Sequence, residues 1–350
     1  MADIISGFPD SILCYILSFL PTKQVVATSV LSKRWNLLWR SVPSFDYEHH
    51  DPTGDYEDDL DACSDFLYSM FSHLLLRDMD KPLHRLRLTC CSGYNHYSIE
   101  IWIEAALRRS SRLEHLDLNV YKDFVVPSVV FSCKTLVVLK LANLVLKDVS
   151  FADFPFLKIL HLNSICFSGC QDLFKQFLSG SPNLEDLEAK NLDANHAEKV
   201  NRLPKLVRAN IDAHIVPLEN VKNVQLNRLK SSKQCFLVLE VLKHCPKLQT
   251  LFINICQKQN LVAEDDEEAI LPCPDPVPAC ILLHLTCCCL KNYSGSAFEF
   301  KFAEYILQNA NYLQFFAFGI YRNNPSRRDY MIRDLSSCMK ISDTCKLEFV

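Results

Sequence analysis

Glycine is scarce in this chain, and its spacing excludes several common nucleotide-binding and hydrolase motifs. Only 7 of the 350 residues are glycine. The two nearest, Gly169 and Gly180, stand 180 − 169 = 11 positions apart. The dinucleotide fingerprint, the Walker A loop and the nucleophile elbow of serine hydrolases each need two or three glycines within about six positions. The sequence therefore contains none of these three motifs.

An excess of basic residues is also missing. The chain has 37 Lys and Arg against 41 Asp and Glu, a formal net charge of −4, whereas nucleic acids and anionic membranes are bound through clustered Lys and Arg. The most apolar stretch, Phe131 to Leu146, carries two lysines and is shorter than the ~20 residues that span a bilayer. The N-terminal MADIISGFPD is acidic where a secretory signal would be basic. We expect a soluble cytoplasmic and/or nuclear protein that binds neither nucleic acid nor a membrane.

Metal-binding and catalytic motifs are missing as well. The 17 cysteines include no pair spaced as C-x-x-C. The nearest approach to a metal site is Cys280, His284 and Cys287 beside Cys288 and Cys289. Because free cysteine is among the residue types most often buried, and this segment alternates like a strand, we favour reduced core cysteines over a zinc site. We expect no metal and no cofactor.

No histidine begins the zinc-protease pattern H-E-x-x-H, and His196-Ala197-Glu198 lacks the downstream P-C-x-x-C of zinc deaminases. A cysteine nucleophile would leave no signature, because its histidine partner adjoins it only in space. We expect that the chain is not an enzyme.

Three short helices are predicted in the first 47 residues. The first carries one apolar stripe with steps of 1, 3, 1 and 3, formed by Ile12, Leu13, Ile16, Leu17 and Leu20. Pro9 suits its first turn, and Pro21 ends it. Thr22 and Ser32 can cap the two helices that follow, the last of which is KRWNLLWR. So small a unit buries too little surface to be robust alone, and a partner helix or the next domain must cover its apolar residues.

The segment FPDSILCYILSFLPTKQVVATSVLSKRWNLLWRSVPSFDY closely resembles an F-box. The match includes the opening Phe8-Pro9, the Leu20-Pro21 break and the segment from Val30 to Trp35, and Phe8 stands where the family more often has Leu. The resemblance implies that residues 1–47 bind a Skp-type linker protein and through it a cullin. The residues that match the family motif, and so should make this contact, are Phe8, Pro9, Ile12, Leu13, Leu20, Pro21, Val30, Leu31 and Trp35.

A degenerate leucine pattern, L-x-x-L-x-L, recurs eight times in the middle of the chain. Its copies begin at Leu83, Leu113, Leu136, Leu157, Leu184, Leu206, Val221 and Leu248. The steps of 30, 23, 21, 27, 22, 15 and 27 residues mostly fall at or near the 20–29 residues of a leucine-rich repeat. Over residues 82–262 the pattern predicts a solenoid of parallel strands with convex helices. The short step leaves the register at Val221 open.

Two acidic stretches separate the predicted parts. Residues 48–81 form an acidic connector and a first helix, and residues 263–276 form an acidic, proline-rich linker. Such segments repel themselves and are typical of exposed connectors; a docking site for a basic partner is the alternative.

The C-terminal residues 277–350, which begin VPACILLHLTCCCLKNYSGSAFEFKFAEYILQNANYLQFFAFGI, look like the FBD domain that follows leucine-rich repeats in many plant F-box proteins. Leu290 stands where that family usually has Trp. A helix is predicted over residues 300–309 and a strand over 313–318. The resemblance implies an α/β segment that caps the repeat array.

If the leucines of each strand point inward, the residue between the last two pattern positions points to the opposite, concave face. That position holds Arg87, Asp117, Lys140, His161, Glu188, Asn210, Gln225 and Phe252. Both charge signs together with amides and an aromatic ring suit a protein epitope better than a phosphate or a nucleic acid. We expect this row to capture a protein target. The alternatives are ordinary solvated residues, or a recognition site near Tyr293 or Tyr321 in the C-terminal segment.

The sequence thus predicts an α/β protein with a three-helix F-box, a leucine-rich-repeat solenoid and an FBD-like cap. The resemblance implies a substrate-recognition adaptor of a Skp-cullin-F-box type E3 ubiquitin ligase. The alternative is a non-ligase leucine-rich-repeat scaffold whose F-box-like helices cap the N-terminal end. An adaptor should leave Pro9, Leu13 and Trp35 at least partly available, whereas a cap should bury them against the first repeat. The target, any small-molecule co-ligand and the regulation leave no trace in the sequence.

Overall fold

The computed structural model describes residues 5–49, 60–90, 94–110, 112–147, 152–168, 173–192, 203–212, 218–229, 235–255, 274–320 and 325–350. Residues 50–59 of the first acidic stretch, residues 263–273 of the second and Tyr321 lie outside these residues. The chain divides into two compact units. Unit 1 comprises Met1–Pro182 and Asn191–Ala194, and unit 2 comprises Asn183–Lys190 and Asn195–Val350.

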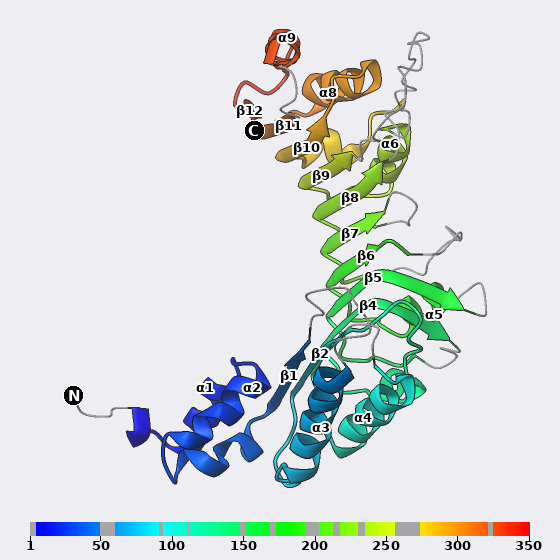
Figure 1. Cartoon of the computed structure of the whole chain (residues 1–350). Coiled ribbons are helices and arrows are strands. Elements are labelled where there is room, and N and C mark those ends of the chain that lie inside the picture. Colours follow the sequence, from blue (N-terminus) through cyan, green and yellow to red (C-terminus); the bar gives the residue numbers. More distant parts are fainter. Residues whose placement is uncertain are drawn as a thin grey trace. The chain divides into compact units, whose positions relative to one another are not determined.

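Unit 1 begins with the predicted cluster of short helices. These are η1 (Ile5–Gly7), α1 (Asp10–Leu17), α2 (Thr22–Ala27), η2 (Thr28–Val30) and η3 (Trp35–Ser41), and α1 and α2 are drawn in dark blue in Figure 1. The third predicted helix is therefore a 3-10 helix rather than an α-helix.

Neither residue predicted as a helix cap stands at the N-cap position of its helix. Arg34 occupies that position in η3, although the Ser32 hydroxyl accepts a hydrogen bond from the backbone N–H of Trp35 at 3.5 Å. Thr22 does not cap α2, since Pro21 occupies the cap position. The Thr22 hydroxyl instead accepts a hydrogen bond from the backbone N–H of Asp46 at 2.8 Å.

The sheet of unit 1 is parallel, and its strands follow chain order. They are β1 (Ser44–Glu48), β2 (Arg85–Thr89), β3 (His115–Asn119), β4 (Val138–Lys147) and β5 (Ile159–Ser168). The sequence analysis predicts no strand at β1, whose alternation covers only five residues, with Phe45 and Tyr47 buried. The inward leucines of the other strands have at most 1% of their surface exposed, among them Leu86, Leu116, Leu139 and Leu160.

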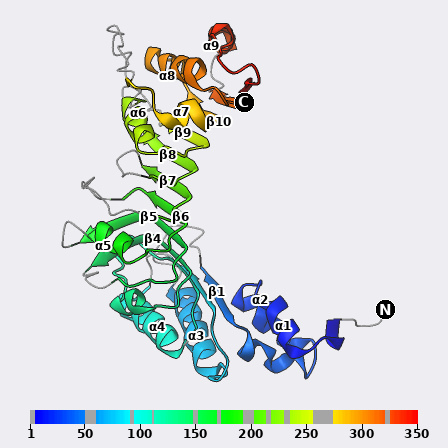
Figure 2. The same ribbon diagram turned by 180° about the vertical axis from the view of Figure 1, so that it is seen from behind.

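Helices join the strands of unit 1. They are α3 (Leu60–Leu76), α4 (His96–Arg109), η4 (Ser128–Ser132) and α5 (Leu173–Ser179). Helices α3 and α4 lie side by side in both views (Figures 1 and 2). The buried indole of Trp102 on α4 donates a hydrogen bond to the carbonyl of Met70 on α3 at 2.9 Å. The two helices are thus held together by packing and by a directed polar contact.

Unit 2 continues the same construction with parallel strands in chain order. They are β6 (Asp186–Lys190), β7 (Arg208–Asp212), β8 (Asn223–Leu229), β9 (Thr250–Ile255), β10 (Cys287–Tyr293), β11 (Phe315–Ile320) and β12 (Lys346–Phe349). Its helices are α6 (Cys235–Lys243), α7 (Ala279–Leu283), α8 (Ala297–Asn309) and α9 (Pro325–Ser337).

Each of the eight leucine patterns contains a strand, including the doubtful one at Val221, which holds β8. The expectation that ILLHLTCCCL is one strand is wrong. Pro278 supplies the N-cap of α7, so the first half is helical and the strand β10 begins only at Cys287. In the part of the chain described, no helix is both long and apolar enough to cross a membrane.

Asparagine takes a left-handed backbone at two strand positions where most side chains would be strained. Asn143 has φ 54° and Asn292 has φ 62°, a region that asparagine tolerates better than most residues. The amide of Asn143 donates to the Asn119 side chain at 2.9 Å, and that of Asn292 donates to the Asn254 side chain at 3.0 Å. Each bond reaches the preceding strand and so reinforces the strand order within its unit.

Candidate functional site

The helices of residues 5–42 enclose a small core of their own. Its buried members are Leu13, Cys14, Leu17, Val25, Trp35, Leu38 and Val42, with Leu20 and Trp39 packed against it. Leu13 has no exposed surface, and Trp35 has 8% exposed. The expectation that these two residues stay available to a partner is therefore wrong. They hold the three helices together instead.

Several other large apolar side chains of this segment are exposed, and we call eight of them the helical apolar surface. Its members are between 39% and 88% exposed and comprise Phe8, Ile12, Tyr15, Ile16, Phe19, Val30, Leu31 and Leu37. So many exposed large apolar side chains in one short segment are more typical of an interaction site than of ordinary surface. The helical apolar surface is therefore the candidate partner site of unit 1.

The predicted Skp-type contacts divide into three groups. Five are exposed (Phe8, Pro9, Ile12, Val30 and Leu31), two are half-buried (Leu20 and Pro21), and Leu13 and Trp35 are buried. The family motif does not point to Tyr15, Ile16, Phe19 or Leu37. The i, i+4 spacing of Ile12 and Ile16 was a signal that could have added Ile16 to the predicted contacts.

Arg34 ties the start of η3 to the start of α1. Its guanidinium donates to the Asp10 carboxylate at 2.7 Å and 3.0 Å, and also to the carbonyl of Phe8. An exposed ion pair of this kind adds little stability by itself. Its effect here is to fix the backbone that presents Phe8 and Pro9.

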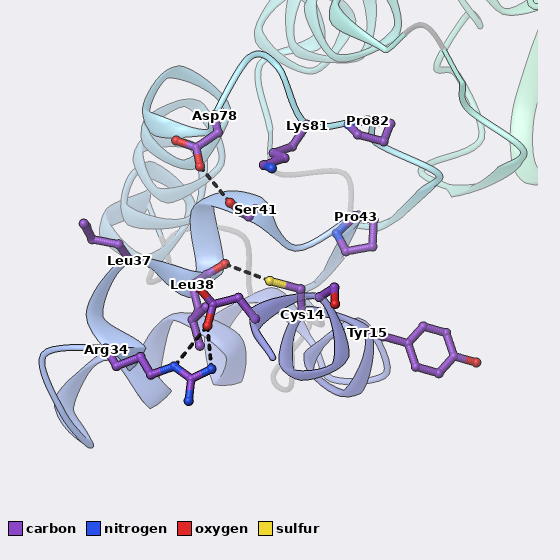
Figure 3. A pocket seen from close by; sticks show the side chains of 12 residues that line it. Cys14, Tyr15, Arg34, Leu37, Leu38, Ser41, Pro43, Asp78, Lys81 and Pro82 are labelled. Carbon is purple, nitrogen blue, oxygen red and sulfur yellow. Dashed lines mark hydrogen bonds and ion pairs between the residues drawn. The ribbon is translucent and has the colours of Figure 1, made fainter. Parts of the chain in front are cut away.

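A hollow of about 440 Å³ lies beside this ion pair, between α1, η3 and residues 78–82 (Figure 3). Of its charged groups, Asp10 binds Arg34, and Asp78 accepts a hydrogen bond from the Ser41 hydroxyl at 2.7 Å. Lys81 also lines the hollow. The Tyr15 ring points away from the other side chains drawn. Three of the four charged groups are thus already engaged within the protein.

Arg77, at the end of α3, joins the helical segment to the rest of unit 1. The residue is 8% exposed, and its guanidinium donates to four backbone carbonyls: Val42, Arg40 at 3.4 Å, Lys81 at 3.2 Å and Pro82 at 2.6 Å. Burial lowers the pKa of Arg77, but a guanidinium stays charged in proteins. These bonds fix the helical segment relative to the strands of unit 1.

Four predicted target-binding residues lie side by side on the sheet of unit 1. Arg87 pairs in register with Asp117, Asp117 with Lys140, and Lys140 with His161. We call these four residues the charged row. All are half-buried, whereas Leu116, which precedes Asp117 on β3, is fully buried. The strand alternation thus places the four on the face opposite the core.

The charged row extends to β1, which the sequence analysis missed. Arg87 lies 3.9 Å from the Asp117 carboxylate, 3.6 Å from Asp46 and 3.8 Å from Glu48. Burial raises the pKa of Asp117, although Lys140 and Arg87 lower it. Arg87 therefore forms ion pairs with carboxylates on both neighbouring strands, β1 and β3.

The other four predicted residues align in the same way on the sheet of unit 2. Glu188 pairs with Asn210, Asn210 with Gln225, and Gln225 with Phe252. We call these four residues the amide row. Phe252 is 43% exposed, although it is a large apolar side chain.

Hydrogen bonds connect the polar members of the amide row. Asn210 donates to Glu188 at 2.9 Å and accepts from Asn227 at 2.6 Å, and Asn227 in turn accepts from Gln225 at 3.2 Å. The polar groups are therefore preorganised, and Phe252 ends the row as its apolar member.

The cysteine cluster is divided between the two faces of β10. Cys288 is fully buried, whereas Cys287 and Cys289 are half-buried on the other face. Cys280 lies in the core, where burial raises its pKa to about 11, and His284 is exposed. Within the described residues, no group of three or more His, Cys, Asp or Glu is placed to hold a metal. The zinc alternative has no support from these positions.

The alternative recognition site near Tyr293 or Tyr321 cannot use the Tyr293 side chain itself, and Tyr321 lies outside the described residues. Tyr293 is 1% exposed and packs edge-on against the ring of Phe318. Leu290, at the position where the FBD family usually has Trp, is also 1% exposed. Both residues belong to the core of unit 2, and neither can touch a target directly.

Two family models match this chain. The F-box domain model covers residues 5–47, which include the helical apolar surface, and the FBD model covers residues 273–318, which include α7, α8 and β10.

Curated relatives from Arabidopsis thaliana are named for an F-box, and two of the three for FBD as well. The chain is 27% identical to "F-box/FBD/LRR-repeat protein At4g26340" over 99% of this chain and 100% of that protein. It is 28% identical to "FBD-associated F-box protein At5g56370" over 91% of this chain and 90% of that protein. A 38% match to "F-box/LRR-repeat protein At4g14096" covers 53% of this chain and 39% of the relative.

Proposed function

Because the chain carries an F-box and an FBD domain, we propose that it is a substrate-recognition adaptor of a Skp-cullin-F-box type ubiquitin ligase, acting in the cytoplasm and/or nucleus. F-box proteins generally serve as such adaptors. The F-box binds a Skp-type linker that joins it to a cullin, and the sheet captures a protein target. Ubiquitin transfer takes place on the recruited conjugating enzyme. This chain contributes effective concentration and orientation of the target rather than a catalytic group.

The observation that carries this proposal is the helical apolar surface. Seven buried residues form the core of the helices. Phe8, Ile12, Ile16 and Phe19 do not belong to this core and remain exposed after the helices have folded. Burying a side chain of this size against a partner is worth about 1.5–3 kcal/mol. A few such contacts suffice for a stable complex with the linker.

Adjacent residues of α1 provide the test. Ile12→Asp changes an exposed side chain and should abolish capture of a purified Skp-type protein while the circular dichroism spectrum and melting temperature stay unchanged. Leu13→Asp places a charge in the core and should unfold the helical segment. Tyr97→Asp, at a 71% exposed ring on α4 outside the F-box, is the matched control and should keep binding. Full capture by the folded Ile12→Asp variant would refute the assignment.

For the remainder of the chain we propose a leucine-rich-repeat solenoid over residues 82–262 with an FBD cap over residues 277–350. Parallel strands in chain order within each unit and buried leucines at alternate positions support this architecture. The charged row of unit 1 and the amide row of unit 2 are then each a target-binding surface of their own unit.

Target capture has its own test. Replacing Lys140, His161 and Glu188 together with Ala should reduce capture of target proteins while folding and linker binding are retained. The matched control replaces the same three residue types on the exposed side of α6: Glu240, Lys243 and His244. Proteins recovered with the Ile12→Asp chain serve as candidate targets, since the ligase components are lost from that sample. Equal loss from both triple variants would argue against the two rows.

One observation favours the alternative of a non-ligase scaffold whose F-box-like helices cap the N-terminal end. Arg77 binds carbonyls of the helical segment and also those of residues 81–82, and so attaches this segment to the rest of unit 1. A scaffold would show no linker binding in wild-type protein, so the same pull-down separates the two functions.

A further inference from the structure

One side of the β12 backbone has no strand partner among the residues that the structure describes. Lys346 N donates to the Gln314 carbonyl at 2.9 Å, and Val350 N donates to the Phe318 carbonyl at 2.9 Å. Since alternate residues of a strand direct their backbone groups to opposite edges, the N–H and C=O of Leu347 and Phe349 face away from β11. Within the described residues, β12 pairs with no second strand.

The side chains of β12 are also incompletely covered. Leu347 and Phe349 are half-buried, and the Phe349 ring stacks on Phe318 with centroids 5.6 Å apart. Lys346 and Glu348 are exposed and share the other face of the strand. An open edge of this kind is a template for another strand.

We propose that two copies of this chain associate through antiparallel pairing of their β12 strands, centred on Leu347. A two-fold axis between identical edges requires the antiparallel direction. At this register the two Leu347 residues exchange both backbone hydrogen bonds. Lys346 of each copy lies opposite Glu348 of the other on the same face of the sheet, so two cross-strand ion pairs form.

The charges select this register over its neighbour. Pairing centred on Glu348 would set the two Glu348 carboxylates directly against each other, an arrangement that is destabilising. Lys346 would then face the apolar side chain of Val350 in place of Glu348, so both Lys346–Glu348 ion pairs would be lost. The complementary order of Lys346 and Glu348 around Leu347 therefore identifies a second copy as the occupant of this edge.

The test measures the mass of the full chain by sedimentation velocity over a concentration series. Wild-type protein should shift from 40.2 kDa toward twice that mass as the concentration rises. Lys346→Glu and Glu348→Lys should each remain monomeric, because each substitution places like charges opposite one another in both pairs. Lys340→Glu makes the same charge change outside β12 and should dimerise as wild type does.

Mixing the two single variants provides the decisive sample. In a mixed pair, every Glu faces a Lys, so an equimolar mixture of Lys346→Glu and Glu348→Lys chains should regain the dimer. This recovery also shows that both variants are folded. A wild-type chain that stays monomeric throughout, single variants that dimerise like wild type, or a mixture that stays monomeric would each overturn the proposal.

Discussion

The F-box helix α1 and the strand β4 differ in how well the polarity of a side chain predicts whether it is buried. On α1, Leu13 is fully buried while the equally apolar Ile12 is 43% exposed. On β4, Leu139 is fully buried while the half-buried Lys140 takes the outer face. In the strand, side-chain chemistry identifies the face. In the short helix it does not, because one apolar set builds the core and another stays available to a partner.

Substitutions in β4 should show the largest contrast. Leu139→Ala should lower the free energy of unfolding by about 2–5 kcal/mol, since it leaves a cavity among packed leucines. Lys140→Ala, one residue later, should change it by less than about 0.5 kcal/mol. Urea unfolding followed by circular dichroism measures both. Comparable losses would mean that the two faces of the sheet are not divided as the burial indicates.

Arg77 tests the attachment of the F-box helices to the strands. Arg77→Met removes a charged donor from four backbone carbonyls and should destabilise unit 1 by about 1.5–3 kcal/mol. Limited proteolysis should then cut residues 5–42 before the strands. Arg108→Met, at a 71% exposed side chain paired with Glu104, is the control and should cost less than about 0.5 kcal/mol. Identical protease patterns in the two variants would contradict a specific role for Arg77.

The smallest expected effect is a pH dependence at His73, whose ring lies 5.5 Å from that of Trp39 and whose Nδ1 lies 2.8 Å from the Tyr47 hydroxyl. Burial lowers the pKa of His73, so the unfolded chain binds this proton more readily than the folded one. Stability should therefore be intact above the unfolded pKa of about 6.5 and fall as the pH drops below it.

His73→Phe keeps a ring at this position but removes the titration. The variant should lose less stability than wild type between about pH 7.5 and pH 5.5, and the contribution of His115, whose pKa is also lowered by burial, cancels in the comparison. Equal losses in the two proteins would exclude His73 as the source.

The alternation of leucines made the sheet predictable. A residue between two inward leucines must face outward, which is why Arg87, Asp117 and Lys140 could be aligned without coordinates. Strand β1 was not predicted because its alternation of buried and exposed residues covers only five positions, SFDYE. The ion pairs of Arg87 with Asp46 and Glu48 follow from that strand and were missed with it.

The F-box segment was predicted correctly as a motif but less well residue by residue. Matching a family pattern does not separate core members such as Leu13 and Trp35 from exposed ones such as Ile12, because both are apolar. Long-range polar contacts leave even less signal. Arg77 reaches carbonyls 35 and 37 positions earlier in the chain, and backbone acceptors carry no residue identity that a sequence could reveal.

The in-register alignment of the charged row and of the amide row has a consequence for how such a protein can diversify. Outer-face residues such as Lys140 and Asn210 belong to strands whose alternate apolar residues fill the core, among them Leu139 on β4 and Ile211 on β7. An exchange at one outer position changes the surface and the hydrogen bonds or ion pairs of that residue, but it leaves the apolar core beneath in place. Duplicated copies of such a gene could therefore acquire new targets one substitution at a time, because the protein stays folded after each substitution.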